Sequence, residues 1–337
     1  MNPILVELVR GGITESFHRG VVCVVDEHGD VIFSVGDIKQ VCFPRSALKY
    51  VQHIPLLTSE IFDHYNFTSK ELSLMCGSHN GEDQHVEVVN GVLAKIGLDP
   101  TCLKCGAQNP TRKSDWIKLI KNGDFAQAVH NNCSGKHAGF LAFNAFHNLD
   151  TSNYLSSEFE LQRKIKECVA HFAELETSEL TVGMDGCSAP TYAMPVYNQA
   201  LMYKNLVAPN NKISTEEQNA AKRIIAAVAE YPEMIAGTKR YCTDLMKVTN
   251  GRIIGKTGAD GVYCLAIPEK KWGISIKVDD GKMGPQYQIA QSVLLELGLL
   301  SEEEATMLNP YYEFDISNFA GNFASQTRVV NLKNESN

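Results

Sequence analysis

The sequence predicts an α/β fold in which strands from both ends of the chain form one antiparallel sheet flanked by helices. Two observations predict it: β-rich segments occupy the first 40 residues and residues 252–278, whereas the segments between them mostly have helical periodicity. A helix expected over residues 285–299 would cover one face of the sheet, and a helical insert, about residues 44–250, would pack on the other. We therefore expect a single catalytic domain over residues 1–330, followed by a frayed tail over residues 331–337.

Local patterns predict the individual elements. Residues 16–26 and 31–37 are rich in β-forming residues, and the segment Glu27-His28-Gly29-Asp30 between them has the composition of a hairpin turn. Near the other end, tight connections join three predicted strands, residues 252–257, 261–268 and 271–278. Helical periodicity predicts helices over residues 69–76, 82–96, 111–122, 137–146, 158–172 and 215–231.

Composition disfavours several classes of function. The 337-residue chain is 44% hydrophobic, which is enough for a large core, and its formal net charge is −8. Its basic residues are spread out, which disfavours nucleic acids and membrane surfaces as partners. The N-terminus does not resemble a secretory signal, and no apolar run approaches the roughly 20 residues of a membrane-spanning helix. The ten cysteines lack disulfide-scaffold spacing, so we expect reduced thiols and a cytoplasmic protein.

Three short motifs occur in an order that indicates a serine hydrolase. Ser46-Ala47-Leu48-Lys49 has the form S-x-x-K, Ser78-His79-Asn80 has the form S-x-N, and Lys256-Thr257-Gly258 is K-T-G on a predicted strand. This trio, in this order, is typical of β-lactamases and penicillin-binding proteins. Each motif alone is weak, and the first two lie closer together than in penicillin-recognising enzymes, so the prediction depends on their joint order.

The spacing of the first motif suits nucleophilic catalysis. Residues three apart share a helix face, so Lys49 could remove the proton of a nucleophilic Ser46. Pro44 indicates a helix start, which would bring backbone N–H groups close to Ser46 for a developing oxyanion. Lys256 would supply a second positive charge. The alternative interpretation of S-x-x-K alone is a solvated helix start.

A second group of residues has two interpretations. Two Gly-bearing turns carry Cys133, His137 and Cys187, whose side chains have the donor atoms that zinc prefers. From the residues alone, buried thiols in tight turns are favoured over a metal site. Glu82 could complement a helix dipole, or it could be an anion that holds a substrate ammonium group.

These segments together resemble one family. They are Phe43-Pro44-Arg45-Ser46-Ala47-x-Lys49, Cys76-x-Ser78-His79-x-Gly81-Glu82, Cys105-Gly106, Asn132-Cys133-Ser134-Gly135-Lys136-His137-Ala138-Gly139, Asp185-Gly186-Cys187-x-Ala189-Pro190 and Gly255-Lys256-x-Gly258. The family is that of the Rhizobium etli type L-asparaginases, also called class 3 or asparaginase II. The resemblance extends over about residues 10–290, and its Cys-Ser-Gly-Lys-His-Ala-Gly run is specific.

The resemblance implies an amidohydrolase that converts L-asparagine to L-aspartate and ammonia, with little action on glutamine. It implies a fold like that of serine β-lactamases and glutaminases, a homodimer, and a small-molecule substrate. It also implies two Ser–Lys pairs in each site, which fall on Ser46 with Lys49 and on Ser78 with Lys256.

The resemblance further implies a zinc ion, whose role in catalysis stays open. Its ligands fall on Cys133, Lys136 and Cys187, with Asp185 and His137 at or near the metal. Lysine is an unusual zinc ligand, because it must be neutral to bind. For the substrate, we expect contacts with Arg45, His79, Glu82 and Asp185.

Other functions stay open at this point. One is a penicillin-recognising or D-peptidase-like serine enzyme, and a glutaminase is the nearest neighbour in chemistry. Another is a non-catalytic amino-acid sensor on the same fold, which would bind asparagine without turnover.

Overall fold

The computed structural model describes residues 1–312, 314–330 and 332, which divide into two compact units. Unit 1 comprises Met1–Ala47, Met194–Ala208 and the chain from Asp244 onwards, and unit 2 comprises Leu48–Ala193 and Pro209–Thr243. The expected helical insert therefore corresponds to unit 2, apart from a short excursion back into unit 1. The single catalytic domain stays a prediction, and the expected frayed tail lies, except for Leu332, outside the described residues.

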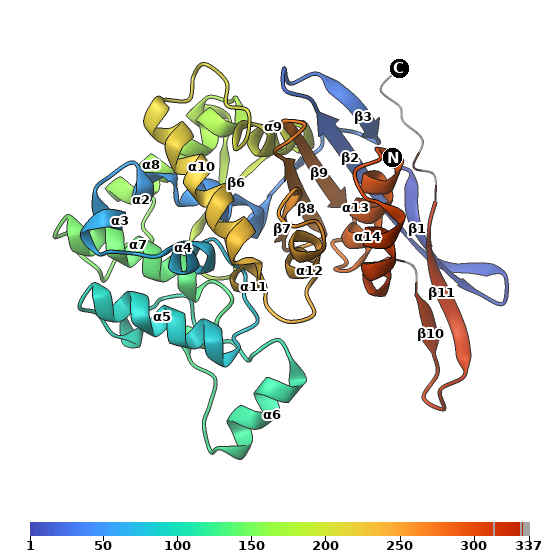
Figure 1. Ribbon diagram of the computed structural model, residues 1–337, viewed down its shortest axis with the longest axis horizontal. Helices are drawn as coiled ribbons and strands as arrows, with labels where there is room; N and C mark the ends of the chain where they lie inside the picture. Colours follow the sequence, from blue (N-terminus) through green and yellow to red (C-terminus); the bar gives the residue numbers. More distant parts are fainter. Residues whose placement is uncertain (313, 331, 333–337) are drawn as a thin grey trace. The chain divides into compact units, whose positions relative to one another are not determined.

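Apart from β4, the described strands of unit 1 form one antiparallel sheet (Figure 1), in the order β10-β11-β1-β2-β9-β8-β7, with β3 also paired to β2. β2 lies between strands from both ends of the chain, since it pairs with β1 and β3 and also with β9. The strands of unit 1 are β1 (Ile4–Arg10), β2 (Ile13–Val25), β3 (Val31–Val35), β4 (Val41–Cys42), β7 (Ile254–Gly258), β8 (Val262–Ile267), β9 (Trp272–Val278), β10 (Asp315–Ser317) and β11 (Phe323–Val329).

The two ends of the chain meet in this sheet, as predicted. Val6 of β1 pairs with Val329 of β11, and Val24 of β2 pairs with Ile274 of β9. The expected α/β fold, an antiparallel sheet built from terminal strands and flanked by helices, is therefore confirmed. The strands are long enough to be specified by their own apolar patterns, but their pairing joins residues more than 200 positions apart.

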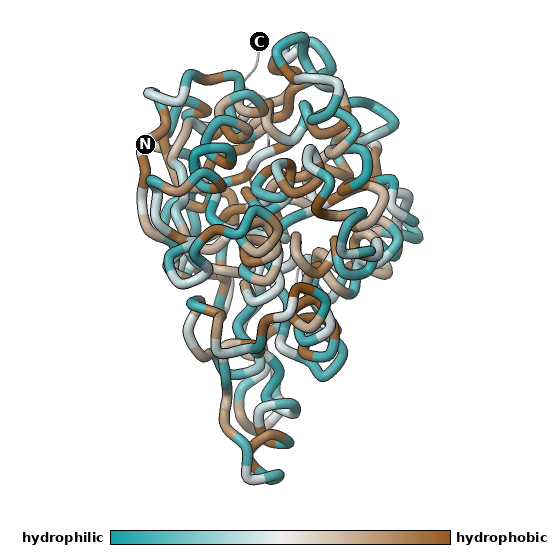
Figure 2. The backbone as a smooth tube through the Cα atoms, turned by 90° about the vertical axis from the view of Figure 1, so that its left-hand side faces the viewer, coloured by the Kyte–Doolittle hydropathy of each residue, from teal (hydrophilic) through white to brown (hydrophobic). Residues whose placement is uncertain are grey.

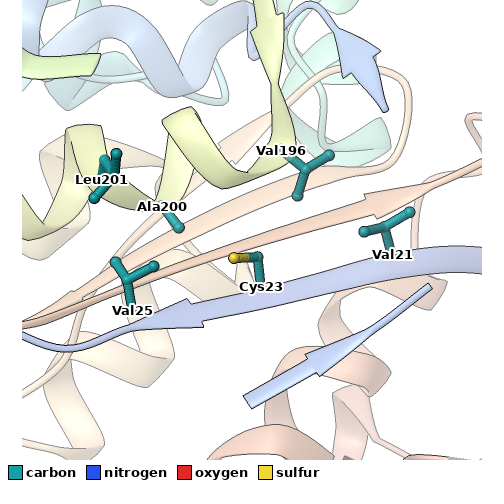
Figure 3. Packing of buried hydrophobic residues seen from close by; sticks show 6 residues of the cluster. All are labelled: Val21, Cys23, Val25, Val196, Ala200 and Leu201. Atoms are coloured by element: carbon teal, nitrogen blue, oxygen red, sulfur yellow. The ribbon is translucent and has the colours of Figure 1, made fainter. Parts of the chain in front are cut away.

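One helix covers each face of the sheet. Val21, Cys23 and Val25 of β2 point toward α9 (Val196–Asn205), where Ala200 and Leu201 complete a buried cluster (Figure 3). Successive strand residues point to opposite faces, so Val22 and Val24 face the other side. There α13 (Pro285–Glu296) contacts β1, β8, β9 and β11.

Two features of unit 1 differ from the sequence-based expectation. The helix predicted over residues 285–299 does not close the chain, because α14 (Glu302–Met307) and the β10–β11 hairpin follow it. α9 was not predicted, because nearly all of its residues are buried, including Asn198, Gln199 and Lys204. A helix that is buried all round has no amphipathic period to detect.

Unit 2 is mainly helical. Five of the six helices predicted there start within two residues of their observed start; the sixth, predicted to start at 137, begins at Ser134. Its elements are α1 (Lys49–Gln52), α2 (Ile54–Leu57), α3 (Ile61–His64), α4 (Ser69–Met75), α5 (Asp83–Lys95), α6 (Lys113–Lys121), α7 (Ser134–Phe146), α8 (Glu160–Ala173), α10 (Thr215–Glu230) and α11 (Pro232–Ile235), while α12 (Tyr241–Val248) begins in unit 2 and ends in unit 1.

The central helix of unit 2 is α7, whose residues 134–144 are all buried. Two glycines allow this close packing. A Cβ on Gly135 would lie 2.5 Å from the Leu74 carbonyl oxygen, and one on Gly139 would lie 2.9 Å from His53 Nε2. The first turn of α7 carries Lys136 and His137, so the core packing of this helix fixes two residues of the candidate site.

A short strand pair continues unit 2. β5 (Thr181–Met184) pairs antiparallel with β6 (Pro190–Pro195), and the tight turn between them carries Asp185 and Cys187. Ser188 adopts a left-handed backbone in this turn, at φ 69°. The end of β6 belongs to unit 1, where Pro195 pairs with Val41 of β4.

Hydrophobic stretches of the chain are short and alternate with hydrophilic ones (Figure 2). Over the residues that the structure describes, no helix combines the length and apolar character needed to cross a membrane.

The contact between α9 and β9 depends on Gly273. A Cβ at this position would clash with the Ala200 carbonyl oxygen and with the backbone nitrogen of Lys204, and neither backbone atom can move without displacing α9. We expect Gly273→Ala to lower the free energy of unfolding by about 2–3 kcal/mol, as overpacking of a filled core does. Urea unfolding monitored by circular dichroism measures this change.

Gly91→Ala is the matched control, because a Cβ at Gly91 in α5 meets no atom within 4 Å. There, alanine should raise stability by up to about 1 kcal/mol through helix propensity. Equal stabilities of the two variants would contradict the close approach of α9 to β9.

Candidate active site

The side chain of Lys49 is the centre of the polar site in unit 2. Lys49 is the first residue of α1 and is fully buried. Its Nζ donates to Ser78 Oγ at 3.0 Å, to the Asn132 carbonyl oxygen at 3.1 Å and to the Gly77 carbonyl oxygen. Three acceptors from two loops therefore surround one buried amine.

The chemical identity of these acceptors matters. Two are carbonyl oxygens, which only accept, and the third is a hydroxyl, which can also donate. An ammonium group satisfies all three as acceptors. A neutral amine satisfies the carbonyls of Gly77 and Asn132 with its two N–H groups and turns its lone pair toward Ser78. The second state is the geometry of a general base that takes the Ser78 proton.

The other predicted Ser–Lys residues belong to unit 1. Ser46 lies in a 3-10 turn, Arg45–Leu48, that leads into α1, so the expected helical start is present in this form. Lys256 lies in the middle of β7, is fully buried, and donates to the Thr257 carbonyl oxygen at 2.9 Å. Thr257 Oγ1 and Tyr287 Oη are hydrogen-bonded at 3.0 Å.

The sequence paired Lys49 with Ser46, and Ser78 with Lys256. The hydrogen bond described here joins Lys49 to Ser78 within unit 2. Each expected pair has one member in each unit, so both pairings stay predictions.

Arg45 has a constrained backbone. It adopts the left-handed region, with φ 54°, and its guanidinium forms an ion pair with Asp260 in unit 1. Gly258 is required beside it, because a Cβ there would clash with the Pro44 carbonyl oxygen. Arg45 was expected to contact the substrate, and in unit 1 its charge is engaged by Asp260.

His79 is held inside unit 2 by hydrogen bonds at both ring nitrogens. Nδ1 accepts from the Gly81 N–H at 3.1 Å, which leaves the proton on Nε2. Nε2 lies 3.0 Å from Ser134 Oγ, which itself donates to the Val129 carbonyl oxygen at 2.8 Å. Burial, and then the neighbouring His85, lower the pKa of His79 well below its ordinary value. A neutral imidazole with both nitrogens engaged has no free group for a substrate.

The carboxylate of Glu82, just before α5, also has hydrogen-bond donors on both of its oxygens. Its Oε1 accepts from Asn80 Nδ2 at 3.0 Å and from the Thr238 N–H at 2.8 Å. Its Oε2 accepts from Gln84 Nε2 at 2.8 Å and from Thr238 Oγ1 at 3.1 Å. Burial alone raises the pKa of Glu82, but these donors outweigh burial and lower it to about 2.

Cys133, Lys136 and Cys187 come together from two distant turns of unit 2, as the sequence resemblance implied. All three are almost fully buried, and Lys136 Nζ lies 3.0 Å from Cys187 Sγ. The two thiols are hydrogen-bonded to each other. Asp185 Oδ2 lies 4.0 Å from Cys187 Sγ, so a carboxylate adjoins the group.

The charges in this group are interdependent. The hydrogen bond from Cys187 lowers the pKa of Cys133 well below its ordinary value, against the effect of burial. The same bond, reinforced by burial, raises the pKa of Cys187. Burial lowers the pKa of Lys136, but the charges of both sulfurs and of Asp185 outweigh burial and raise it. The ionisation of each of these three side chains therefore depends on the other two.

His137 lies next to this group. The Lys104 N–H donates to Tyr154 Oη at 2.8 Å, and Tyr154 Oη is hydrogen-bonded to His137 Nδ1 at 2.7 Å. His137 Nε2 is buried and has no partner among the described residues. Over those residues, no three His, Cys, Asp or Glu side chains are arranged to hold a metal.

Sequence reasoning missed the roles of several residues of the site. Gly77 and Asn132 lie within the motif segments, but they act through backbone carbonyls, which side-chain identity does not reveal. Thr238 and Tyr154 belonged to no motif, and they contact motif residues only through tertiary structure.

Comparisons with known proteins give a family and weak structural likenesses. A family model described as L-asparaginase II matches residues 6–329. No curated protein sequence matches the chain. Among solved structures, Mglu in its tris and glutamate form is 12% identical with a TM-score of 0.48, covering 89% of this chain, and this chain spans 64% of Mglu.

Two further solved structures are similar at the same level. A β-lactamase from Mycobacterium bovis is 12% identical with a TM-score of 0.42, over 82% of this chain and 94% of its own. A Bacillus glutaminase is 14% identical with a TM-score of 0.37, over 83% and 91%. TM-scores below 0.5 at such identities say nothing about the reaction.

The hydrogen bonds of Glu82 predict a pH-dependent stability. Because the folded pKa of about 2 lies below the ordinary value of 4.5, the contribution is complete above pH 4.5 and is lost as the pH falls toward 2. We expect Glu82→Gln to lower the free energy of unfolding by about 1.5–3 kcal/mol at pH 7, as for hydrogen bonds to a charged group. Urea unfolding at a series of pH values should show the difference from wild type shrinking between pH 4.5 and 2. A difference independent of pH would contradict an ionised Glu82 in this network.

Proposed function

The chain belongs to the L-asparaginase II family, and on this premise we propose that it hydrolyses L-asparagine to L-aspartate and ammonia, the reaction of EC 3.5.1.1. We further propose that it is an enzyme of the Rhizobium etli type, on the motifs that surround Ser46, Ser78, Cys133 and Lys256. Family membership makes the chain an amidohydrolase, and the choice of asparagine is the proposal.

One observation supports a serine–lysine mechanism above the others. Lys49 Nζ is buried against two carbonyl oxygens and the hydroxyl of Ser78, at 3.0 Å. In its neutral form, this amine can accept the proton of a serine and return it to the leaving group.

The proposed reaction has two steps. A serine oxygen attacks the side-chain amide carbon of asparagine while lysine takes the hydroxyl proton, and the C–N bond then breaks as ammonia leaves with that proton. Water next attacks the acyl-serine, gives a proton to the same lysine, and releases aspartate while the serine regains its hydrogen. The atoms balance as one amide and one water giving one carboxylic acid and one ammonia.

We assign the roles from the motifs and from the Lys49 contacts together. Ser46 is the proposed nucleophile and Lys49 the base, and Ser78 carries protons to and from Lys49. Lys256 provides a positive charge that stabilises the oxyanion formed when the serine attacks the amide carbon. The roles of Ser46 and Lys256 come from the sequence motifs alone.

Ammonia release from a panel of asparagine, glutamine and simple amides tests this function. We expect wild type to favour asparagine, and Ser46→Ala, Ser78→Ala and Lys49→Met to lower kcat by roughly a thousandfold or more, as loss of a catalytic group does. Ser59→Ala is a control, because its hydroxyl bonds only to the carbonyls of Pro55 and Leu56 in unit 2.

The outcomes separate the assignments. Activity near wild type in Ser46→Ala would remove Ser46 as nucleophile, and mass spectrometry of quenched enzyme would locate the acylated serine. Preference for glutamine would indicate a glutaminase instead. Reaction with a fluorescent penicillin would favour a penicillin-recognising enzyme, and asparagine binding without turnover would indicate a sensor.

We also propose a zinc ion held by Cys133, Lys136 and Cys187. The donor set fits: two sulfurs and one nitrogen converge in a buried group, and the Cys133 thiol already has a lowered pKa. When bound, the metal would supply a positive charge for an anionic group of the substrate. Binding requires Lys136 to give up its proton, because only a neutral amine can bind a metal. The bonds from the metal to the two sulfurs and to the amine must therefore outweigh the cost of removing this proton.

Elemental mass spectrometry of purified protein tests the zinc proposal. We expect about one zinc per chain in wild type and none in a Cys133→Ser/Cys187→Ser variant. Cys264→Ser is the matched control, since Cys264 is a buried thiol beside Ser275 in unit 1. Equal zinc in all three proteins would exclude this site.

The homodimer and the cytoplasmic location stay proposals from the sequence. Light scattering decides the first, because a dimer has twice the 37.2 kDa mass of the chain. Fractionation of the source cells decides the second.

A further inference from the structure

We propose that Glu82 does not hold the substrate but positions Ser78, by fastening the loop of residues 78–82 to the segment of residues 235–240. Within this assignment, Thr238 and Arg240 are positioning residues that no sequence motif marks. The inference rests on the proposed function only in that Ser78 takes part in the reaction.

The first support is the set of hydrogen bonds between the loop and the segment. The Ser78 N–H donates to the Ile235 carbonyl oxygen at 2.7 Å. Asn80 Nδ2 donates to the Thr238 carbonyl oxygen at 3.1 Å, and Arg240 Nη1 donates to Asn80 Oδ1 at 2.7 Å. Asn80 is buried, so each of these bonds replaces one that water would otherwise make.

The second support is the capacity of the Glu82 carboxylate. A carboxylate has about four lone-pair positions, two on each oxygen. Two donors bond to Oε1 and two to Oε2. Thr238 bonds to both oxygens, to Oε1 through its N–H and to Oε2 through its hydroxyl. The Arg112 guanidinium adds a positive charge 3.6 Å from Oε1. A substrate ammonium group would have to displace these partners.

The third support is that the contact excludes side chains. Gly237 has φ 106°, and a Cβ there would lie 2.8 Å from Glu82 Oε1 and 2.9 Å from Asn80 Nδ2. A Cβ on Gly77 would clash with the Met234 carbonyl oxygen. Two glycines are therefore needed at this contact, one on each of the two chain segments. Gly77 is needed because backbone approaches backbone, and Gly237 because the side chains of Glu82 and Asn80 lie against it.

These contacts bear directly on the Lys49–Ser78 hydrogen bond. The backbone nitrogen of Ser78 is fixed by Ile235, and its side-chain oxygen lies 3.0 Å from Lys49 Nζ. A hydrogen bond of this length is lost when the atoms separate by a further ~0.5–1 Å, and proton transfer is lost with it. Releasing the segment should therefore lower the rate of the chemical step more than the affinity for substrate.

The test compares Thr238→Val, Thr238→Ser and Glu82→Gln in steady-state ammonia release from asparagine. Thr238 is exposed, so valine removes the hydroxyl without disturbing a core. We expect Thr238→Val to lower kcat about tenfold, the effect of one hydrogen bond to a charged group, with KM changed less than about twofold. Thr238→Ser keeps the hydroxyl and should restore kcat. Glu82→Gln places an amide donor against donors and should lower kcat further.

A binding role for Glu82 predicts the opposite pattern. Loss of its charge would raise KM in Glu82→Gln while Thr238→Val stayed like wild type, and this result would overturn the proposal. The control is Thr306→Val. Among the described residues, the Thr306 hydroxyl bonds only to the Glu302 carbonyl oxygen on exposed α14.

Amide hydrogen exchange, read by mass spectrometry, gives a second readout that needs no turnover. We expect peptides covering residues 77–86 and 234–242 to exchange faster in Thr238→Val and Glu82→Gln than in wild type. In Thr306→Val, the same peptides should exchange at the wild-type rate. Unchanged exchange in both variants would overturn the proposal. If wild type releases no ammonia from asparagine, the proposed function fails, whereas the exchange data still decide whether Glu82 fastens the loop.

Discussion

The buried amine of Lys49 imposes the strictest constraint on unit 2. A charged or polar group in the interior is costly unless each of its hydrogens has a partner. Here the partners are the Gly77 and Asn132 carbonyl oxygens and the Ser78 hydroxyl, which come from two loops far apart in sequence. Both loops must therefore approach the same amine. Close packing around them also requires glycine, since Gly77 and Gly135 each allow a backbone approach that any side chain would prevent.

Unit 1 meets a different requirement, which is to join the two ends of the chain in one sheet. β2 pairs with β1 from its own end and with β9 from the other. Its apolar residues alternate between two faces, and α9 and α13 each cover one of them. Such long-range pairing closes very large loops, so this sheet cannot form before most of the chain has been made.

Polar side chains near the motifs are mostly used to hold the site together. His79 uses both ring nitrogens within unit 2, and the Glu82 carboxylate accepts four hydrogen bonds from its own chain. Both residues looked available for a substrate in the sequence, where a polar residue in a motif carries no sign of its partners. The cluster of Cys133, Lys136 and Cys187 differs, because soft sulfur donors beside a nitrogen suit a cation as well as one another.

The sequence by itself determined the class of the fold, the main helices of unit 2, five strands of the sheet (β2, β3, β7, β8 and β9), and the family. Those features depend on local periodicity and on short runs of residues, such as the one from Cys133 to Gly139. Such local patterns can be recognised without knowledge of distant contacts. Tertiary structure alone decided that Lys49 meets Ser78, 29 positions away, that Glu82 meets Thr238, 156 positions away, and that α9 is buried all round. It also decided that α14 and the β10–β11 hairpin follow α13. The physical reason is common to these cases: hydrogen-bond partners and burial are set by which distant segments pack together, and no local pattern records that.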